Sequence, residues 1–239
     1  KWATDESGKL VLGADGFPMA ASQEGVIGDP NPDWRGSMGL NGNYKNLNFN
    51  LLVETCQGNQ MWAGTYGVLN NFGITPETAN EFTVSAADAA KIYDYRGVSL
   101  ATAATAGANG LAVVNADGSI TARGNLKDFG AGNVWLNQYW YTSLGGGFGS
   151  VAEQFITDAS WTRIRELSLS YALPKAWSDA VRIPGGISVG FTGRNLALWT
   201  KFKGVDPETN LTGVSNGRGL DYFNNPGTKS YLFNIKFNL

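Results

Sequence analysis

The chain has 239 residues, of which 43% are hydrophobic, 12% aromatic and 16% charged, and its formal net charge is −2 at pH 7. It has no histidine and one cysteine, Cys56, which excludes His-ligated or Cys-cluster metal sites, a histidine general base and an internal disulfide. The charge gives no basic footprint for nucleic acid, and 32 glycines among many aromatic residues favour a large β-structure.

The beginning of the chain carries no targeting segment. Lys1 is not an initiator methionine, and no signal peptide follows it. We therefore expect a processed protein or a piece of a longer one. No run of about 18 apolar residues occurs, so the sequence predicts no transmembrane helix.

Five segments alternate between apolar and polar residues with a period of two, which indicates strands with one apolar side. In the first, Trp34 and Met38 share one side, whereas Arg35 and Asn41 share the other. Each alternation continues for roughly ten residues, which is typical of a transmembrane β-strand. We expect strands over residues 34–45, 47–56, 161–173, 187–199 and 230–239.

The connections between these segments differ in length. Residues 45–46 and 174–186 form short connections, whereas residues 57–160 and 200–229 form long ones. Outer-membrane barrels have short periplasmic turns and long extracellular loops. The expected organisation is an extracellular segment at 1–33, barrel hairpins at 34–56 and 161–199, extracellular loops at 57–160 and 200–229, and a C-terminal strand at 230–239.

Aromatic residues lie near both ends of the expected strands. Trp34 and Tyr44 are ten residues apart with the same parity, and so are Trp161 and Tyr171. Ten residues of about 3.3 Å each, tilted by about 45°, cover roughly 23 Å, close to the ~25 Å apolar band of outer-membrane barrels. A soluble sandwich with an aromatic core face is the alternative. The expected membrane girdle is Trp34, Tyr44, Trp161, Tyr171, Trp199, Tyr231 and Phe237.

The polar side of the strands would face a lumen and hold a plug through hydrogen bonds and ion pairs, with direct substrate contact as the alternative. The residues expected there are Arg35, Asn41, Asn43, Asn48, Asn50, Glu54, Glu166 and Arg194. Glu54 and Arg194 have opposite charges, but the sequence does not place them together.

Two places interrupt the alternation. Arg163 and Arg165 share the parity of Leu167, so either they snorkel to lipid head groups or a bulge turns them inward. Leu196 and Leu198 change the parity of the fourth segment, which a bulge near residues 193–195 would explain.

Several motifs follow one another along the chain: GDPNPDW at 28–34, YKN at 44–46, DASWTRIRELSLSY at 158–171, GRNL at 193–196 and GVDPE at 204–208. Together they resemble the C-terminal part of the SusC/RagA-type TonB-dependent transporters of Bacteroidetes. The resemblance covers nearly the whole chain. It departs from the family at Leu239, where the assembly signal usually carries an aromatic residue.

The resemblance implies an all-β fold, in which these segments are the last five antiparallel strands of an outer-membrane barrel of about 22 strands with long extracellular loops. Five strands alone cannot close, because the smallest bacterial barrels need about eight. The family's partners would be a SusD-like surface lipoprotein, the remaining N-terminal barrel and plug, TonB acting through that missing part, and outer-membrane lipid. The implied activity is import of oligosaccharides or peptides, without enzymatic chemistry, cofactor or metal.

The segment 57–160 is too long for an idle connection. It carries expected helix starts at Thr75-Pro76-Glu77 and Ser85-Ala86-Ala87-Asp88, and an expected hairpin around Asp117-Gly118. Its aromatic cluster would stack on substrate or, alternatively, pack against a neighbouring loop or the lid lipoprotein. The cluster consists of Trp135, Tyr139, Trp140 and Tyr141.

Two other classes of protein compete with a transporter. A non-transporting surface glycan-binding protein would use Trp135 and Trp140 as stacking platforms. A hydrolase is disfavoured, because no carboxylate pair stands out and histidine is absent. Residues 145–149 are glycine-rich but lack the Lys-Ser/Thr of a phosphate loop, which favours a flexible loop. A calcium-loop spacing is absent, although Asp5, Glu6 and Asp15 carry possible ligands.

Overall fold

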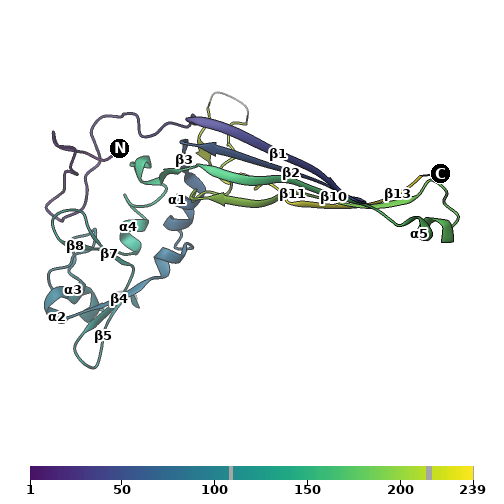
Figure 1. The fold of residues 1–239 in the computed structure, drawn as a ribbon. Coiled ribbons are helices and arrows are strands. Elements are labelled where there is room, and N and C mark those ends of the chain that lie inside the picture. Colours follow the sequence, from purple (N-terminus) through teal and green to yellow (C-terminus); the bar gives the residue numbers. More distant parts are fainter. Residues whose placement is uncertain (108–109, 214–216, 239) are drawn as a thin grey trace. The chain divides into compact units, whose positions relative to one another are not determined.

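The structure is a computed structural model that describes residues 1–107, 110–213 and 217–238 (Figure 1). It divides into two compact units. The loop unit consists of Lys1–Gly28 and Trp62–Ile156, and the sheet unit of Asp29–Met61 and Thr157–Leu239. Within the described residues, no helix is long and apolar enough to cross a membrane.

The sheet unit is built on one antiparallel sheet of five strands in the order β1-β2-β10-β11-β13. These are the five segments that the period-two alternation predicts, with bounds that differ by at most two residues where the structure describes them. Leu239, placed in the last expected strand, lies outside the described residues. The strands are β1 Trp34–Tyr44, β2 Leu47–Gln57, β10 Trp161–Ala172, β11 Ile187–Thr200 and β13 Ser230–Phe237.

A β-bulge interrupts the register in the middle of β10. Ile164 pairs with Val53 of β2, but Glu166 pairs with Leu52, so Arg165 is an extra residue. On the other side, Ile164 pairs with Ala197 and Glu166 with Arg194, so β11 also loops out here. Asn195 has a φ of 53° at this point. The bulge expected near residues 193–195 is therefore confirmed, and it acts together with one in β10.

The short connections are a tight turn and a small helix. Lys45 adopts a left-handed φ of 54° in the turn between β1 and β2. Helix α5, Lys175–Ala180, follows Pro174 between β10 and β11, and Ser178 is its buried residue. A further small sheet has the order β12-β3-β9, with β12 Leu220–Asp221, β3 Gln60–Ala63 and β9 Ile156–Asp158.

The loop unit contains short helices and two small sheets, β4-β6-β5 and β7-β8. The long segment between the second and third expected strands is thus an ordered structure rather than a bare connection. Its helical elements are α1 Gly64–Asn71, η1 Pro76–Ala79, α2 Ala86–Ala89, α3 Leu100–Thr105, α4 Gln138–Tyr141 and η3 Ala152–Phe155. Its sheet strands are β4 Glu81–Val84, β5 Ala112–Val114, β6 Ile120–Arg123, β7 Asn125–Asp128 and β8 Asn133–Leu136.

Local sequence signals predict several of these elements. Ser85 caps α2, because its side chain accepts a hydrogen bond from the Asp88 N–H. Thr75 precedes η1, which begins at Pro76. Strands β5 and β6 form the expected hairpin around Asp117-Gly118, with Val114 opposite Ile120.

Among the described residues of the loop unit, two apolar clusters contribute to its core. The larger one gathers Leu100, Ile120 and Trp135 with small alanines from the helices and strands around them. The second one joins Phe17, from the N-terminal segment, to Val134 and Trp140. Isolated bridges such as Leu12 with Pro18 fold that N-terminal segment back on itself. Burial of large side chains from both parts explains why Lys1–Gly28 belongs to this unit.

The glycine-rich segment at residues 145–149 is packed rather than loose. Gly145 and Gly146 are buried, and the Gly147 N–H donates to the Gly67 carbonyl at 3.0 Å. A Cβ on Gly147 would lie 2.6 Å from the Val68 nitrogen. The expectation of a flexible loop is therefore wrong, since these glycines permit a close backbone approach to α1.

Candidate functional site

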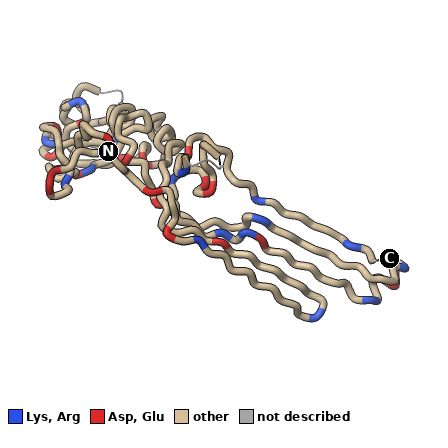
Figure 2. The backbone as a smooth tube through the Cα atoms, turned by 90° about the horizontal axis from the view of Figure 1, so that it is seen from above, with Lys and Arg blue, Asp and Glu red and all other residues tan. Residues whose placement is uncertain are grey.

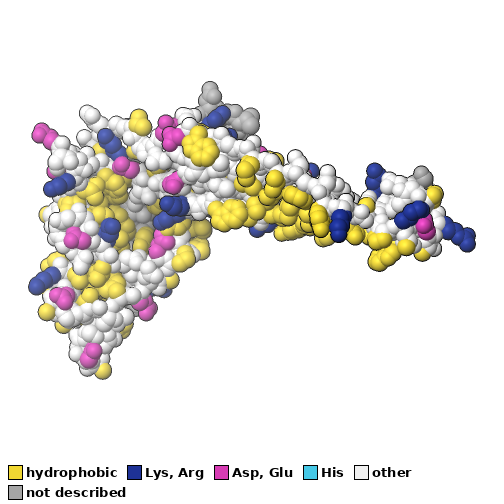
Figure 3. All heavy atoms as spheres, in the orientation of Figure 1, with side chains coloured by type: hydrophobic (Ala, Val, Ile, Leu, Met, Phe, Trp, Pro, Cys, Tyr) yellow, Lys and Arg dark blue, Asp and Glu magenta, His cyan; other side chains and the backbone are white. Residues whose placement is uncertain are grey.

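One face of the five-stranded sheet is apolar and solvent-exposed. Register places most of the large apolar side chains of the five strands on this apolar face, and Phe233 is 81% exposed. Figure 3 shows hydrophobic side chains gathered along the strands. Isolated exposed apolar side chains are ordinary, but a continuous face marks an interaction surface. Members of the apolar face include Trp34, Met38, Leu40, Tyr44, Phe49, Leu169, Tyr171, Phe191, Trp199, Tyr231, Phe233, Ile235 and Phe237.

Six of the seven residues expected in the membrane girdle lie on the apolar face, and Trp161 does not. Trp161 pairs with Cys56 of β2, and Cys56 pairs with Arg35 of β1. Because Arg35 lies on the polar face, Trp161 lies there too. It is only 6% exposed. The assignment of Trp161 to the girdle is therefore wrong, because the bulge at Arg165 reverses the parity between Trp161 and Tyr171.

The opposite face of the sheet is polar. All the residues expected to face a lumen lie on this polar face, where Asn41 opposes Asn50 and Asn43 opposes Asn48. Glu166 and Arg194 are opposite each other and form an ion pair of 3.0 Å. Glu54 does not pair with Arg194. The members of the polar face are Arg35, Asn41, Asn43, Asn48, Asn50, Glu54, Glu166 and Arg194.

A cluster of charges joins β10 to the segment that follows β11. The Arg163 guanidinium donates to both carboxylate oxygens of Asp206, at 2.8 and 2.9 Å, and lies 2.9 Å from Glu208. Arg165 bridges Glu208 and Glu54, at 2.6 Å to each. Arg163 is 4% exposed, so this pair is shielded from solvent. The bulge turns both arginines away from the apolar face, which decides between the two alternatives in favour of the inward orientation.

The charged cluster also fixes the bulge in β11. Arg165 donates to the Asn195 side chain at 2.9 Å, and Asn195 donates to the Thr228 carbonyl at 3.0 Å. The sequence motif GVDPE at 204–208 supplies Asp206 and Glu208. Sequence reasoning noted this motif but missed its role as the arginines' partner. The unexplained parity of Arg163 and Arg165 was the available signal, because buried arginines need carboxylate partners.

The aromatic cluster of the loop unit is mostly a packing cluster. Trp135 is fully buried and donates from its indole nitrogen to the Arg123 carbonyl at 2.9 Å. Trp140 is 4% exposed and packs on Phe17, with ring centroids 5.2 Å apart. Of the two alternatives for Trp135 and Trp140, packing against protein therefore holds instead of stacking on substrate, because their faces are occupied by protein. This also removes the platforms that a surface glycan-binding protein would need.

Tyr139 is half-buried and lies beneath a guanidinium. The Arg96 carbon Cζ is 3.3 Å from the Tyr139 ring centroid, a cation–π contact. Arg96 also pairs with Asp94 at 2.7 Å. Burial alone would raise the pKa of Asp94, but hydrogen bonds from Arg96, Val98 and Asn137 outweigh it and hold the pKa below its ordinary value.

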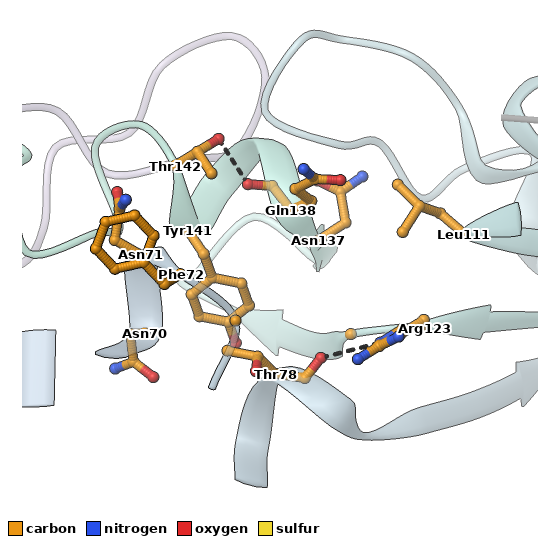
Figure 4. A pocket seen from close by; sticks show the side chains of 12 residues that line it. Asn70, Asn71, Phe72, Thr78, Leu111, Arg123, Asn137, Gln138, Tyr141 and Thr142 are labelled. Atoms are coloured by element: carbon orange, nitrogen blue, oxygen red, sulfur yellow. Dashed lines mark hydrogen bonds between the residues drawn. The ribbon is translucent and has the colours of Figure 1, made fainter. Parts of the chain in front are cut away.

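Tyr141 lines a cavity of about 250 Å³ within the loop unit (Figure 4). Burial raises the pKa of Tyr141, although a hydrogen bond from Asn125 opposes the shift. The Arg123 guanidinium donates to the Thr78 carbonyl at the cavity wall. Carboxamides contribute much of the remaining wall, and no carboxylate does. The lining residues are Asn70, Asn71, Phe72, Gly73, Thr78, Leu111, Arg123, Gly124, Asn137, Gln138, Tyr141 and Thr142.

The cavity wall suits a neutral polar ligand. Carboxamides both donate and accept hydrogen bonds, and Gln138 is exposed there. Phe72 is exposed and packs edge-on against Phe148, with ring centroids 6.2 Å apart. Of the aromatic residues selected from the sequence, only Tyr141 reaches this cavity. The other lining residues come from α1, η1, β6, α4 and the segments beside them, so their proximity depends on the tertiary fold.

Two acidic residues near the N-terminus, Asp5 and Asp15, accept hydrogen bonds from residues close to them in sequence. Asp5 accepts hydrogen bonds from the Ser7 N–H and hydroxyl, and these lower the pKa of Asp5. Asp15 accepts from the Phe17 N–H at 3.1 Å. Across the described ranges of the chain, no group of three or more His, Cys, Asp or Glu residues is arranged to hold a metal ion.

Comparisons with known proteins match this architecture. The chain is 23% identical over 244 residues to TonB-dependent receptor P3 of Formosa agariphila, covering 98% of this chain and 19% of that protein. No family model matches. Two structures of the RagAB peptide importer, one of them in the "open-open" state, each match 98% of this chain at a TM-score of 0.50, with 18% and 19% identity.

These comparisons confirm the resemblance to TonB-dependent transporters. Because the structural identities are low, they establish the fold, which is that of part of such a transporter. The chain spans about a fifth of the length of the proteins it matches, with 19% of the receptor and 21% and 22% of the importer chains covered.

Proposed function

We propose that this chain is the C-terminal part of a TonB-dependent outer-membrane importer of oligosaccharides or peptides. The observation that carries this proposal is the sheet with one exposed apolar face and one polar face. Each outer strand, β1 and β13, has a single neighbour in the described part of the sheet. A sheet of this kind is completed when further strands cover its edges and lipid covers its apolar face.

The apolar face has the dimensions of a membrane-spanning wall. Trp34 and Tyr44 begin and end β1, ten residues apart, and both lie on the apolar face. At about 3.3 Å per residue and a tilt of about 45°, the two rings stand roughly 23 Å apart along the membrane normal. The girdle then consists of Trp34, Tyr44, Tyr171, Trp199, Tyr231 and Phe237.

The polar face lines the lumen in this proposal. The asparagines near the turn between β1 and β2 and the Glu166–Arg194 pair would bind the plug. Earlier strands, in a barrel of about 22, would enclose that plug. The charged cluster around Arg163 and Arg165 fixes the segment after β11 against this wall. TonB would act through the plug, because this chain supplies wall and loops.

The loops lie on the extracellular side in the proposed orientation. The segments 1–33, 57–160 and 200–229 then form the outer vestibule, and residues 45–46 and 174–186 face the periplasm. We assign the cavity lined by Gln138 and Tyr141 to substrate contact in the vestibule, and a SusD-like lipoprotein to the role of lid. The RagAB importer is described as a peptide importer, whereas both peptides and oligosaccharides offer groups that carboxamides recognise.

Heat-modifiable migration of the full-length protein tests the proposal. A closed barrel in detergent migrates faster before boiling than after it, because the closed strands resist detergent unfolding. We expect this shift for the full-length protein, together with copurification of a large surface lipoprotein. Identical migration of boiled and unboiled samples would contradict the barrel, and absence of the lipoprotein would contradict the lid.

A further inference from the structure

Charged residues are missing from a band across the five-stranded sheet. In every strand one section carries no Lys, Arg, Asp or Glu. The residues of the polar face are uncharged there, as well as those of the apolar face. Charges resume at both ends of this band, with different compositions. The charge-free sections are residues 36–44, 47–53, 167–172, 187–193 and 231–235.

At one end of the band, positive and negative charges form the cluster around Arg163 and Arg165. The other end carries the short connections and the end of β13, and it is predominantly basic (Figure 2). Its one acidic side chain among the described residues, Asp179, pairs with Lys175 at 2.7 Å. Lys45, Arg182 and Lys236 have no carboxylate partner in the described part of the chain.

The same end exposes a small apolar surface on α5. Trp177 of α5 is 63% exposed, and Val181, the residue that follows the helix, is 58% exposed. Ser178 is buried, so its side of α5 faces the rest of the protein. An indole and a valine beside unpaired cations form the composition of a membrane-surface anchor.

We propose that this basic end binds the head groups of anionic phospholipids, with Trp177 and Val181 entering the boundary between head groups and acyl chains. The inference rests on the proposed function, which places the sheet across the outer membrane and this end at its periplasmic leaflet. Phosphate groups complement Lys45 and Arg182, and the acyl boundary accepts the two apolar side chains. Lys236 lies opposite Ser188 on the polar face and is not part of this lipid-binding surface. A soluble acidic partner would satisfy the cations but would leave the apolar pair without a role.

Basic residues beside an anionic lipid surface each strengthen binding by about fivefold, so loss of Lys45 and Arg182 corresponds to about 25-fold weaker binding. Their long aliphatic stems can lie along the apolar boundary while the charges reach phosphate. Lys45 already lies over the Tyr44 ring, 5.4 Å from its centroid, which places a cation at the expected girdle.

Native mass spectrometry of the full-length transporter in a non-ionic detergent tests this inference. The probes are palmitoyl-oleoyl phosphatidylglycerol, the corresponding phosphatidylcholine, and inorganic phosphate. The test variant combines Lys45→Gln and Arg182→Gln. A charge-preserving variant combines Lys45→Arg and Arg182→Lys, and a matched control places Lys91→Gln and Lys127→Gln on exposed positions of the loop unit.

We expect the unchanged protein to bind phosphatidylglycerol more tightly than phosphatidylcholine, and not to bind inorganic phosphate. The glutamine variant should lose this preference, while the charge-preserving and loop-unit variants keep it. Trp177→Ala should weaken the binding of both lipids. Equal binding of the two lipids by a heat-modifiable protein would overturn the inference alone. A protein that shows neither heat-modifiable migration nor lipid binding would overturn the proposed function as well.

Discussion

The contribution of the Arg163–Asp206 ion pair to stability depends on the burial of both side chains. Side chains of both residues are nearly inaccessible, with 5% and 7% exposure. Two opposite charges buried together compensate each other, but removal of one leaves a buried charge without a partner, which destabilises the protein. The ion pair therefore holds the segment after β11 beside β10.

Asp206→Ala should consequently destabilise this segment by about 3 kcal/mol, because the variant leaves a buried guanidinium with only Glu208 nearby. Hydrogen exchange of residues 201–213 in the full-length protein would measure the effect. Asp179→Ala, which breaks an exposed pair, is the control and should change stability by less than about 0.5 kcal/mol. Equal protection of residues 201–213 in both variants would show that the buried pair does not hold the segment.

Asp94 makes the loop unit sensitive to acid. Its pKa is lowered in the folded state, so its contribution is fully present above the ordinary value of 3.8 and is lost as the pH falls through the folded-state pKa. We expect the melting temperature of the loop unit to fall as the pH is lowered below about 4. Asp94→Asn should lower stability by about 2 kcal/mol at neutral pH and reduce this acid dependence.

Thermal melts between neutral and acidic pH would measure this dependence, with Glu24→Gln as the control at an exposed carboxyl. The control should keep the acid dependence of the unchanged protein. An Asp94→Asn protein that is as sensitive to acid as the control would assign the sensitivity to other carboxyl groups.

At the scale of the element, neighbouring residues of β13 have opposite environments. Phe233 lies on the apolar face, opposite Phe191, whereas Leu232 lies on the polar face, opposite Thr192. Both are exposed and apolar, so composition alone does not distinguish them. In the proposed barrel, lipid lies against Phe233 on the apolar face, and the lumen lies against Leu232 on the polar face.

Phe233→Arg should therefore reduce assembly far more than Leu232→Arg. An arginine facing lipid near the membrane midplane costs about 2–4 kcal/mol, whereas one facing a polar lumen avoids that cost. The measurement is the amount of heat-modifiable full-length protein in the outer-membrane fraction for each variant. Similar losses from both substitutions would mean that the two faces do not meet lipid and lumen respectively.

The strands were predictable from sequence because their signal is local. A side chain in a strand alternates between faces with a period of two, so each run of residues carries its own evidence. The limits of β1 and β2 follow in the same way from the tight turn at Lys45. The parity conflict of Arg163 and Arg165 with Leu167 offers a bulge as one of two interpretations, and the structure decides for the bulge.

The consequence of that bulge for Trp161 was not predicted. One extra residue reverses every face before it, so a girdle assignment made by counting ten residues fails there. Contacts between distant residues were likewise missed. Asp206 is 43 residues from Arg163, and the burial of Trp135 depends on helices and strands that sequence patterns do not bring together.

For the whole molecule, the cavity of the loop unit is the place where we propose that substrate binds. Gln138 is exposed at the cavity, and its side-chain amide has no hydrogen-bond partner among the described residues. Gln138→Ala should weaken substrate affinity about fivefold in the full-length importer, which corresponds to loss of one hydrogen bond of about 1 kcal/mol. Gln23→Ala, at an exposed position outside the cavity, is the matched control.

Calorimetric titration with the substrate of the full-length importer measures this affinity. The Gln138 variant should still migrate as a heat-modifiable species, since its side chain contributes nothing to the core. An unchanged affinity in a folded Gln138→Ala protein would place substrate recognition elsewhere in the vestibule.

The sheet unit presents an extended uncovered surface, because its apolar face and two outer strands all lack a covering layer in the described chain. Exposed strands with hydrophobic faces pair with other chains. Produced alone in detergent-free buffer, the 239-residue chain should therefore form large assemblies, whereas micelles should disperse it by covering Phe233, Phe237 and their neighbours. Light scattering with and without detergent distinguishes these states. A monodisperse monomer in plain buffer would require the apolar face to find a cover within the chain itself, and the membrane-spanning role would then fail.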